Sequence, residues 1–402
     1  MEHVLKFGMT LLCFSISILT AKFIGRHHYF SFLTFRQGRY GSIDGLRGFL
    51  AISVLFHHFI VTWHWKVNGK WERPPEDYYQ NYGKVGVAIF FAITGFLFIS
   101  KILKDGGKID WIEFYESRIF RIYPLYIFVI FIVTIVVFSS NLKLEVSLNE
   151  LIKAYTQWLT FRPGGIINNF LDTKLVIAGV DWTLQYEWLF YILLPIITIA
   201  IVRLGRFGGL FLFAVCVYLF NKPMQIHSID TSLLIFFAVG GLSAYLNRRY
   251  QIPNSIIRSK WVSSLTALAI AFAIFRPITF DSIHILMISL FFIPIVLGND
   301  LFGVFSLKSS ILLGEISYSI YLLHGIVIYL SFSVFNIAIL KNISFQQYLL
   351  FMPVICVAVI LLSALTFISI EKPCIEFGRK YPISRMLRAI AIKVRKLRSG
   401  KN

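Results

Sequence analysis

Charged side chains are scarce in this sequence, and acidic ones are the scarcest. Only 15% of the 402 residues are Asp, Glu, Lys or Arg, whereas 57% are hydrophobic and 17% are aromatic. The mean hydropathy of +0.72 excludes an ordinary soluble domain and is typical of a protein with many membrane spans. We therefore expect the chain to fold in a lipid bilayer.

The shortage of acidic residues leaves a large positive charge, because 39 Lys and Arg stand against 20 Asp and Glu. Nucleic-acid-binding proteins also carry such an excess, but here the basic residues lie in short loops between apolar segments. That placement is typical of membrane proteins whose cytoplasmic loops collect Lys and Arg. The expected partner is the bilayer, and we expect no nucleic acid.

Cysteine is scarce as well. Cys13, Cys216, Cys356 and Cys374 stand far apart, and three of them lie in or beside apolar runs. This spacing contains neither a disulfide framework nor a metal-binding motif. We expect these side chains to be small core residues, and we expect no metal site and no permanently bound cofactor.

Ten apolar stretches after residue 40 approach the roughly 20 residues that a helix needs to cross a bilayer. They lie at 43–65, 82–104, 122–140, 183–204, 207–221, 229–247, 259–275, 281–298, 311–338 and 346–370. An earlier run, residues 5–25, has no small-residue cleavage site and fits an uncleaved anchor, an extra span or an interfacial helix. The sequence therefore predicts an all-α integral membrane protein, a bundle of about ten transmembrane helices with room for one extra N-terminal helix.

The distribution of Lys and Arg predicts how these spans are oriented. Most basic residues fall on one side when the first of the ten spans runs outward, which favours both ends of the membrane domain in the cytoplasm. We expect a hydrophobic and basic segment at 1–40, a membrane domain at 41–380 and a basic cytoplasmic tail at 381–402. The amphipathic stretch 148–162 is too polar to span, and we expect it to lie on the outer face or to dip into it.

The span at 43–65 carries ionisable side chains at membrane depth, where their high cost marks them as functional candidates. On a helix, Arg47 and His58 share one face and are about three turns, or about 16 Å, apart along the axis. His57 points about 100° away from that face. We expect Arg47 and His58 to act in function, and His57 to make an ordinary contact between helices.

Two further arginines, Arg118 and Arg121, stand at i and i+3 at the inner edge of the span at 122–140. Alone, they fit positive-inside anchors as well as they fit a binding site. Arg47 enters the membrane at the same edge, so three guanidinium groups can converge on phosphates, which their forked donors suit.

A carboxylate, Glu187, lies about one and a half turns inside the span that follows Trp182. An intramembrane carboxylate needs a partner. Counting depth from the two ends places Glu187 and His58 in the same outer half, so we expect His58 to be that partner.

A polar stripe is formed by Ser317, Tyr321 and His324, which stand at i, i+4 and i+7 and therefore share one helix face. Each of them alone more often makes a hydrogen bond between helices, but the whole stripe indicates a polar cavity. The stretch 86–96 instead carries small residues that permit close helix approach, and there we expect packing rather than chemistry.

Together these groups place a basic cluster at the cytoplasmic mouth and an imidazole, a carboxylate and hydroxyls deeper in the membrane. Acyl transfer from an anionic cytosolic donor requires this arrangement, because the donor phosphates need cations and the acceptor hydroxyl needs a base. The alternative is a transporter or flippase for an anionic or glycolipid substrate, without acyl chemistry. Against it, the spans show no evident inverted repeat.

Six motifs resemble those of the acyltransferase-3 family of membrane O-acyltransferases and occur in the order of that family. They are Asp44-Gly45-Leu46-Arg47-Gly48 with His58, then 90–96, 118–124, 182–191, 317–324 and Glu371-Lys372-Pro373. The resemblance covers about residues 40–380. Thr94 and the run 183–186 depart from the usual residues of the family.

The resemblance implies a bundle of ten helices in the inner membrane of a bacterium. It also implies transfer of an acetyl or longer acyl group from acyl-CoA, as donor substrate, to a hydroxyl of a glycan, polysaccharide or lipid-linked saccharide at the outer face. The implied roles are catalysis for His58, Glu187 and Arg47, donor binding for Arg47, Arg118 and Arg121, and the substrate site for Trp182, Ser317, Tyr321 and His324. His58 is favoured as general base, and an acyl-histidine relay is left open.

Overall fold

The computed structural model describes residues 2–30, 41–162, 165–226, 228–277 and 280–382, and these residues form helices and one pair of very short strands. The first half contains α1 (Glu2–Ile24), α2 (Gly41–Asn68), α3 (Asp77–Asp105), α4 (Trp111–Ser140), α5 (Leu148–Leu159), η2 (Leu171–Ile177), α6 (Trp182–Leu204), α7 (Arg206–Asn221), β1 (Gln225–Ile226) and β2 (Ile229–Asp230). The second half contains η3 (Thr231–Leu233), α8 (Leu234–Arg249), α9 (Asn254–Ile257), α10 (Lys260–Phe275), α11 (Ser282–Val296), η4 (Val304–Ser306), α12 (Lys308–Glu315), α13 (Ser317–Tyr329), η5 (Leu330–Val334), η6 (Leu340–Asn342), α14 (Phe345–Leu349), α15 (Met352–Thr366), η7 (Phe367–Glu371) and α16 (Lys372–Lys380). Nearly all of the predicted tail at 381–402 and the end of the predicted segment at 1–40 lie outside the described residues.

Within the described residues, seven helical stretches are long and apolar enough to cross a membrane. Six of them coincide with predicted spans, and the seventh is the N-terminal run, residues 6–24. The other four predicted spans are the helices α7, α8, α10 and α11, which have only 15 or 16 residues. Such helices rise about 24 Å, less than the roughly 30 Å of a hydrocarbon core. The all-α membrane architecture is confirmed, whereas the predicted count of about ten spans is not.

Local signals explain where several helices begin and end. The side chain of Asp110 accepts a hydrogen bond from the backbone N–H of Glu113 at 3.3 Å, which caps α4. Ser147 and Glu150 form a capping box at the start of α5. At its other end, α3 stops at Gly106, whose φ of 60° is a left-handed conformation that glycine adopts without strain.

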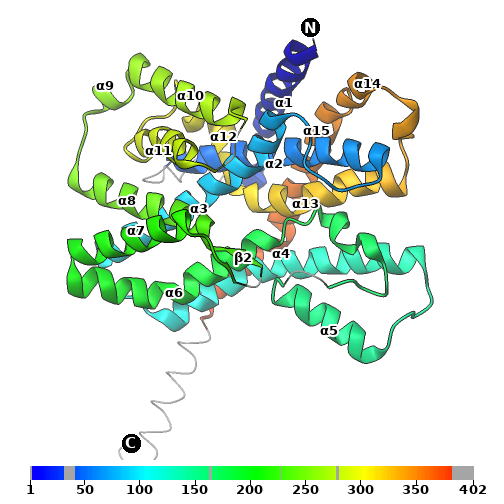
Figure 1. Cartoon of the computed structure of the whole chain (residues 1–402), viewed down its shortest axis with the longest axis horizontal. Helices are drawn as coiled ribbons and strands as arrows, with labels where there is room; N and C mark the ends of the chain where they lie inside the picture. Colours follow the sequence, from blue (N-terminus) through cyan, green and yellow to red (C-terminus); the bar gives the residue numbers. More distant parts are fainter. Residues whose placement is uncertain (1, 31–40, 163–164, 227, 278–279, 383–402) are drawn as a thin grey trace, which may run out of the picture.

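A close helix crossing joins α3 and α8, which lie side by side in Figure 1. A Cβ atom on Gly240 would stand 2.0 Å from the carbonyl oxygen of Ala92, and one on Gly95 would stand 2.2 Å from that of Phe237. The two backbones therefore touch where these residues have no side chain, as small residues in membrane helices permit. This matches the packing role expected for the stretch 86–96.

The predicted span at 311–338 is interrupted, because α12 ends at Glu315 and α13 begins at Ser317. Just before the interruption, α12 crosses α2 closely. A Cβ atom on Gly314 would there meet the carbonyl oxygen of Asp44 at 1.7 Å. The start of α13 thereby comes to lie beside the first turns of α2. Asp44, at the crossing, precedes Arg47 by three residues.

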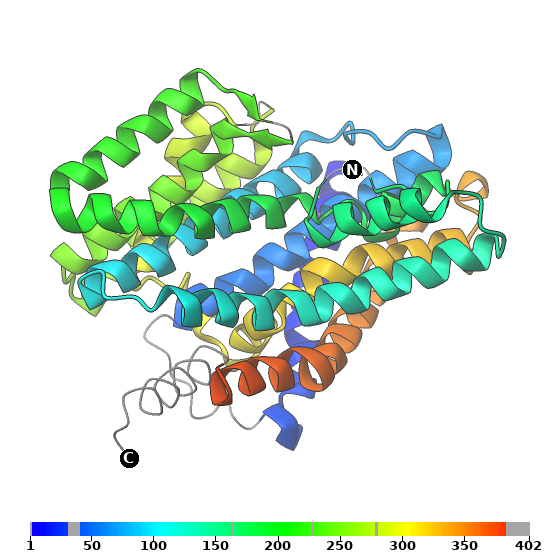
Figure 2. The same cartoon turned by 90° about the horizontal axis from the view of Figure 1, so that it is seen from below.

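The amphipathic helix α5 folds back along α4, and Figures 1 and 2 show the two running side by side. The hydroxyl groups of Tyr123 and Tyr126 donate to the carbonyl oxygens of Leu159 and Trp158, each at 3.0 Å. Trp158 is fully buried. The chain consequently returns along α4 before α6 begins.

The helix α1 stands at the top of Figure 1 and packs against α15. Cys13 on α1 and Cys356 on α15 are both fully buried, as expected for small core residues. The other two cysteines are half-buried and are not disulfide-bonded. Lys6 of α1 also reaches Glu76, the residue before α3, with its Nζ atom 2.9 Å from Oε1.

Candidate active site

Arg47 and Glu187, from α2 and α6, line a cavity of about 550 Å³, here called the Arg47 cavity. Its remaining wall comes from α3, α6 and α13 and consists of Val87, Phe90, Phe91, Thr94, Thr183, Leu184, Ser317, Tyr318 and Tyr321. Ser317 is 1% exposed, and its Oγ atom has no hydrogen-bond partner among the described residues. Four residues proposed from the sequence, Arg47, Glu187, Ser317 and Tyr321, thus face one space.

A second cavity of about 840 Å³, here called the His58 cavity, lies against the first. The two cavities share three lining residues, Val87, Phe91 and Tyr321. His58 and Trp182 line the His58 cavity, and Trp182 is 38% exposed. The Arg47 cavity and the His58 cavity are therefore adjacent and separated by a wall only a few side chains thick.

His58 is held by a second imidazole. Its Nδ1 atom lies 2.9 Å from Nε2 of His324, and Nδ1 of His324 lies 3.0 Å from the carbonyl oxygen of Ile320. Because a carbonyl oxygen only accepts, Nδ1 of His324 carries a proton, and its Nε2 is then the acceptor in a neutral ring. His58 must donate through Nδ1, which leaves its Nε2 unprotonated and able to take a proton.

His57 is turned toward α3 instead. Its Nδ1 atom donates to the carbonyl oxygen of Tyr79 at 3.1 Å. A Cβ atom on Gly83 would lie 2.7 Å from the His57 ring, so the ring packs on the backbone of α3. His57 makes the interhelical contact that its different helix face predicts, and it also lines the His58 cavity.

Glu187 has a different partner from the one expected. Its Oε1 atom accepts a hydrogen bond from the hydroxyl of Tyr191 at 2.8 Å, and Arg118 interacts with the same tyrosine. The depth count compared positions along two helices but not the sides on which they face. Glu187 shares the wall of the Arg47 cavity with Arg47, whereas His58 lines the other cavity.

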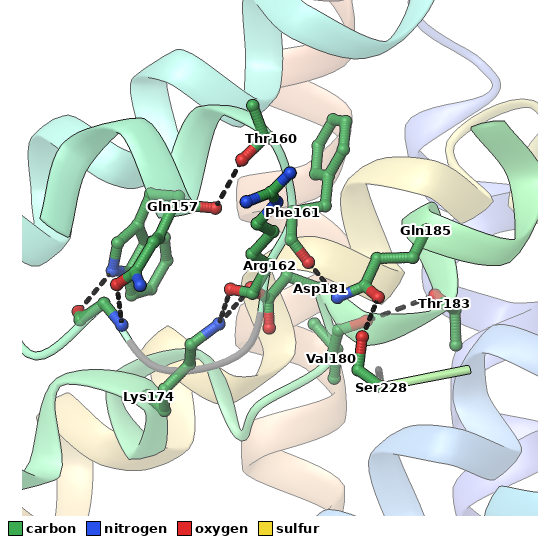
Figure 3. A network of polar contacts seen from close by, with 12 residues as sticks. Gln157, Thr160, Phe161, Arg162, Lys174, Val180, Asp181, Thr183, Gln185 and Ser228 are labelled. Carbon is green, nitrogen blue, oxygen red and sulfur yellow. Dashed lines mark hydrogen bonds and ion pairs between the residues drawn. The ribbon is translucent and has the colours of Figure 1, made fainter. Parts of the chain in front are cut away.

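The start of α6 is fixed by the polar network in Figure 3. Asp181 is 2% exposed and forms an ion pair with Lys174. Thr183 lies 2.9 Å from the hydroxyl of Tyr321, which donates to the carbonyl oxygen of Val180 at 3.1 Å. This network, which the sequence did not reveal, locks the cavity wall of α6 to α13.

Neither Arg118 nor Arg121 lines the Arg47 cavity within the described residues. Arg121 forms no hydrogen bond or ion pair with the part of the chain that the structure describes, but its charge acts on Arg47. Arg118 stacks over the ring of Phe98, with 5.4 Å from its guanidinium carbon to the ring centroid. Arg121 is therefore the arginine whose charge acts on Arg47. Arg118 instead interacts with Tyr191, the hydrogen-bond partner of Glu187.

Glu371 is a functional candidate that reasoning from the sequence did not single out. It is 1% exposed, its Oε1 atom accepts a hydrogen bond from Ser319, and its Oε2 atom has no partner among the described residues. The charges of Arg47 and Arg121 both act on it. It ends the π-helical turn η7, a feature that often marks functional sites. Its place in the last motif, 371–373, was the available signal.

Residues 40–368 match the sequence model of a family described as an acyltransferase domain. The chain belongs to the acyltransferase-3 family. Its curated relatives include O-acetyltransferase OatA from the Staphylococcus aureus strains NCTC 8325 / PS 47, COL and MRSA252, each 24% identical over 317 residues. The alignment covers 70% of this chain and 49% of those proteins, so the acyltransferase-3 chain spans about half the length of the curated relatives it matches. No solved structure matches it.

Proposed function

We propose that this protein is a membrane O-acetyltransferase. It moves an acetyl or other short acyl group from acyl-CoA to a hydroxyl of a glycan, polysaccharide or lipid-linked saccharide. Membership in the acyltransferase-3 family and the activity in the name of OatA support the reaction class. The proposed setting is the inner membrane of a bacterium, with both ends of the membrane domain in the cytoplasm, the donor entering from the cytoplasm and the acceptor from the outer face.

The observation that carries this proposal is the pair of adjacent cavities. Arg47 stands on one and His58 on the other, with Val87, Phe91 and Tyr321 common to both. The phosphates of CoA bind near Arg47, Arg121 and Arg118, because guanidinium groups suit phosphate oxygens. The acyl end of the donor then reaches along the shared wall toward His58.

His58 acts as the general base of the transfer. The acceptor hydroxyl gives its proton to Nε2 of His58 while its oxygen bonds to the carbonyl carbon of the thioester. The carbon–sulfur bond breaks, and the proton passes from the imidazolium to the sulfur of CoA. The products are an ester and free CoA. An acyl-histidine relay through the same nitrogen is the alternative order of steps.

Two further side chains support the reaction. His324 orients the imidazole and stabilises its protonated form, as the carboxylate does in a catalytic triad. Glu187, on the wall of the Arg47 cavity, balances the guanidinium charge beside the donor. Ser317, Thr183 and Tyr321 provide hydroxyl groups on the wall of the Arg47 cavity.

The decisive experiment uses purified protein in lipid nanodiscs with acetyl-CoA radiolabelled in the acetyl group and a panel of glycans. We expect release of free CoA together with labelled glycan. His58→Ala should abolish both and still bind CoA, whereas His57→Ala, the matched neighbour, should lose far less. An intact thioester with every glycan would instead favour transport of the substrate.

A further inference from the structure

Two polar side chains of α3 line the His58 cavity and have no part in the reaction above. Gln80 is 8% exposed, and its Oε1 atom has no hydrogen-bond partner among the described residues. Lys84 stands one helical turn later and lines the same cavity. A buried carbonyl oxygen without a donor is costly, and a bound ligand can remove that cost.

The charge of Lys84 is also uncompensated within the part of the chain that the structure describes. Its Nζ atom lies 5.7 Å from the centroid of the Phe280 ring and forms no ion pair there. Asp230, the acidic side chain of the cavity wall, accepts a hydrogen bond from the backbone N–H of Ser232 at 2.9 Å. A half-buried ammonium in this position attracts an anion.

The rest of the wall suits a sugar ring. Trp182 is packed edge-on against Phe91 and Tyr186, with ring centroids 6.4 Å and 5.5 Å apart, and is 38% exposed. A fixed aromatic ring of this kind can contact the C–H face of a pyranose. Asp230 and Gln80 offer oxygen atoms that accept from hydroxyl groups.

We propose that the His58 cavity binds an anionic saccharide, with its acidic group on Lys84 and its hydroxyls on Gln80 and Asp230. The proposal rests on the proposed acyl transfer and names the class of acceptor. The acidic group lies on the same sugar as the hydroxyl that His58 deprotonates, or on a phosphate attached to it. A lysine, as a compact point charge, binds a carboxylate or a phosphate.

The test compares four probes: methyl glucuronide, the corresponding uronamide, glucose 1-phosphate and methyl glucoside. Saturation-transfer NMR on the full chain in nanodiscs measures binding, and transfer from labelled acetyl-CoA measures kcat/KM for each probe. Lys84→Met should lower binding and kcat/KM for the anionic probes about tenfold to a hundredfold, the usual value of a hydrogen bond to a charged group. The ratio between uronide and uronamide should fall toward one, and Lys84→Arg should restore most of it.

A matched control is Lys70→Met, because Lys70 is exposed, pairs with Glu72 at 3.9 Å and lies outside the cavity. In Lys70→Met, the ratio of kcat/KM for the anionic probes to kcat/KM for the neutral probes should equal the wild-type ratio. Gln80→Leu should weaken every probe, since it removes an acceptor of hydroxyls and leaves Lys84 in place. A preference confined to the uronide assigns the acidic group to a carboxylate, and one confined to glucose 1-phosphate assigns it to a phosphate.

Two results separate this inference from the proposed function. Lys84-dependent binding of the anionic probes without any acetyl transfer supports the anionic site and contradicts the acyltransferase. Acetyl transfer to neutral and anionic probes at equal rates, or a preference that survives in Lys84→Met, overturns the anionic site and leaves the acyltransferase standing.

Discussion

Nδ1 of His58 lies 2.9 Å from Nε2 of His324, although 266 residues separate the two histidines in the sequence. The carbonyl oxygen of Ile320 sets the proton position of His324, and His324 in turn sets that of His58. The free nitrogen of the proposed base is therefore determined by α13 as well as by α2. Each of the two imidazoles has a distinct role that substitution can reveal.

Replacing His324 should impair catalysis without removing the base. In His324→Leu, Nδ1–H of His58 loses its acceptor, so the ring can adopt the other tautomer. We expect kcat to fall about tenfold to a hundredfold, as for other residues that orient a functional imidazole, while His58→Ala should cost about 10²–10⁴. His324→Asn, whose side-chain oxygen can still accept, should recover part of the rate. Steady-state kinetics and the pH profile of kcat/KM test this, and an unchanged profile in His324→Leu would contradict it.

Helical periodicity allowed the sequence to predict which residues share a face. Ser317 and Tyr321 line one cavity, whereas Arg47 and His58 line two different ones. It did not predict which helices meet. Glu187 was paired with His58 by counting depth along straight spans, and the structure gives Glu187 the hydroxyl of Tyr191 instead. Periodicity along one helix does not tell which neighbouring side chain supplies a partner.

A second prediction concerns the binding of CoA by three arginines. If Arg47, Arg121 and Arg118 hold the phosphates of CoA, substitution of each by Ala should weaken CoA binding about tenfold to a hundredfold. Lys should rescue only in part, since it lacks the forked donor geometry. Isothermal titration of CoA into nanodisc protein measures this. Arg203→Ala on α6, which lies outside the site, is the control, and full CoA affinity in all three variants would reduce these arginines to topology anchors.

Glu371 shows a different limit of the sequence. The motif 371–373 was visible, but the π-helical turn η7 shifts the phase of the helix just before it. A face assignment based on 3.6 residues per turn therefore fails at this point. The same holds for the interruption between α12 and α13, where a hydropathy window sees one continuous span.

Replacing Glu371 should act on the donor site. The charges of Arg47 and Arg121 act on its buried carboxyl group, so Glu371→Gln removes this electrostatic interaction while keeping the shape. We expect a higher KM for acetyl-CoA with a smaller change in kcat. Glu376→Gln is the control, because Glu376 is exposed on α16. A change in kcat alone would place Glu371 in the chemical step.

The ion pair between Lys6 and Glu76 should contribute to the stability of the protein in a way that depends on pH. The two side chains are 6% and 13% exposed, and they tie α1 to the residue before α3. Lys6→Met removes one of the two basic neighbours of a largely buried carboxylate, the other being His64 with Nε2 3.5 Å from Oε2, and should therefore destabilise the folded state. Thermal unfolding in nanodiscs should show a lower Tm for Lys6→Met, while Lys70→Met should match the wild type.

The sign of the pH effect follows from the pKa of Glu76. Burial would raise this pKa, but the neighbouring His64 and Lys6 more than offset the burial and lower the pKa from 4.5 to about 2. The folded state thus favours the ionised carboxylate, so its contribution to the free energy of unfolding is complete above pH 4.5 and is lost as the pH falls toward 2. Tm measured from pH 7 to pH 3 should fall more steeply for the wild type than for Glu76→Gln, which has no group to titrate there. Equal slopes for the two proteins would show that ionisation of Glu76 does not stabilise the folded state.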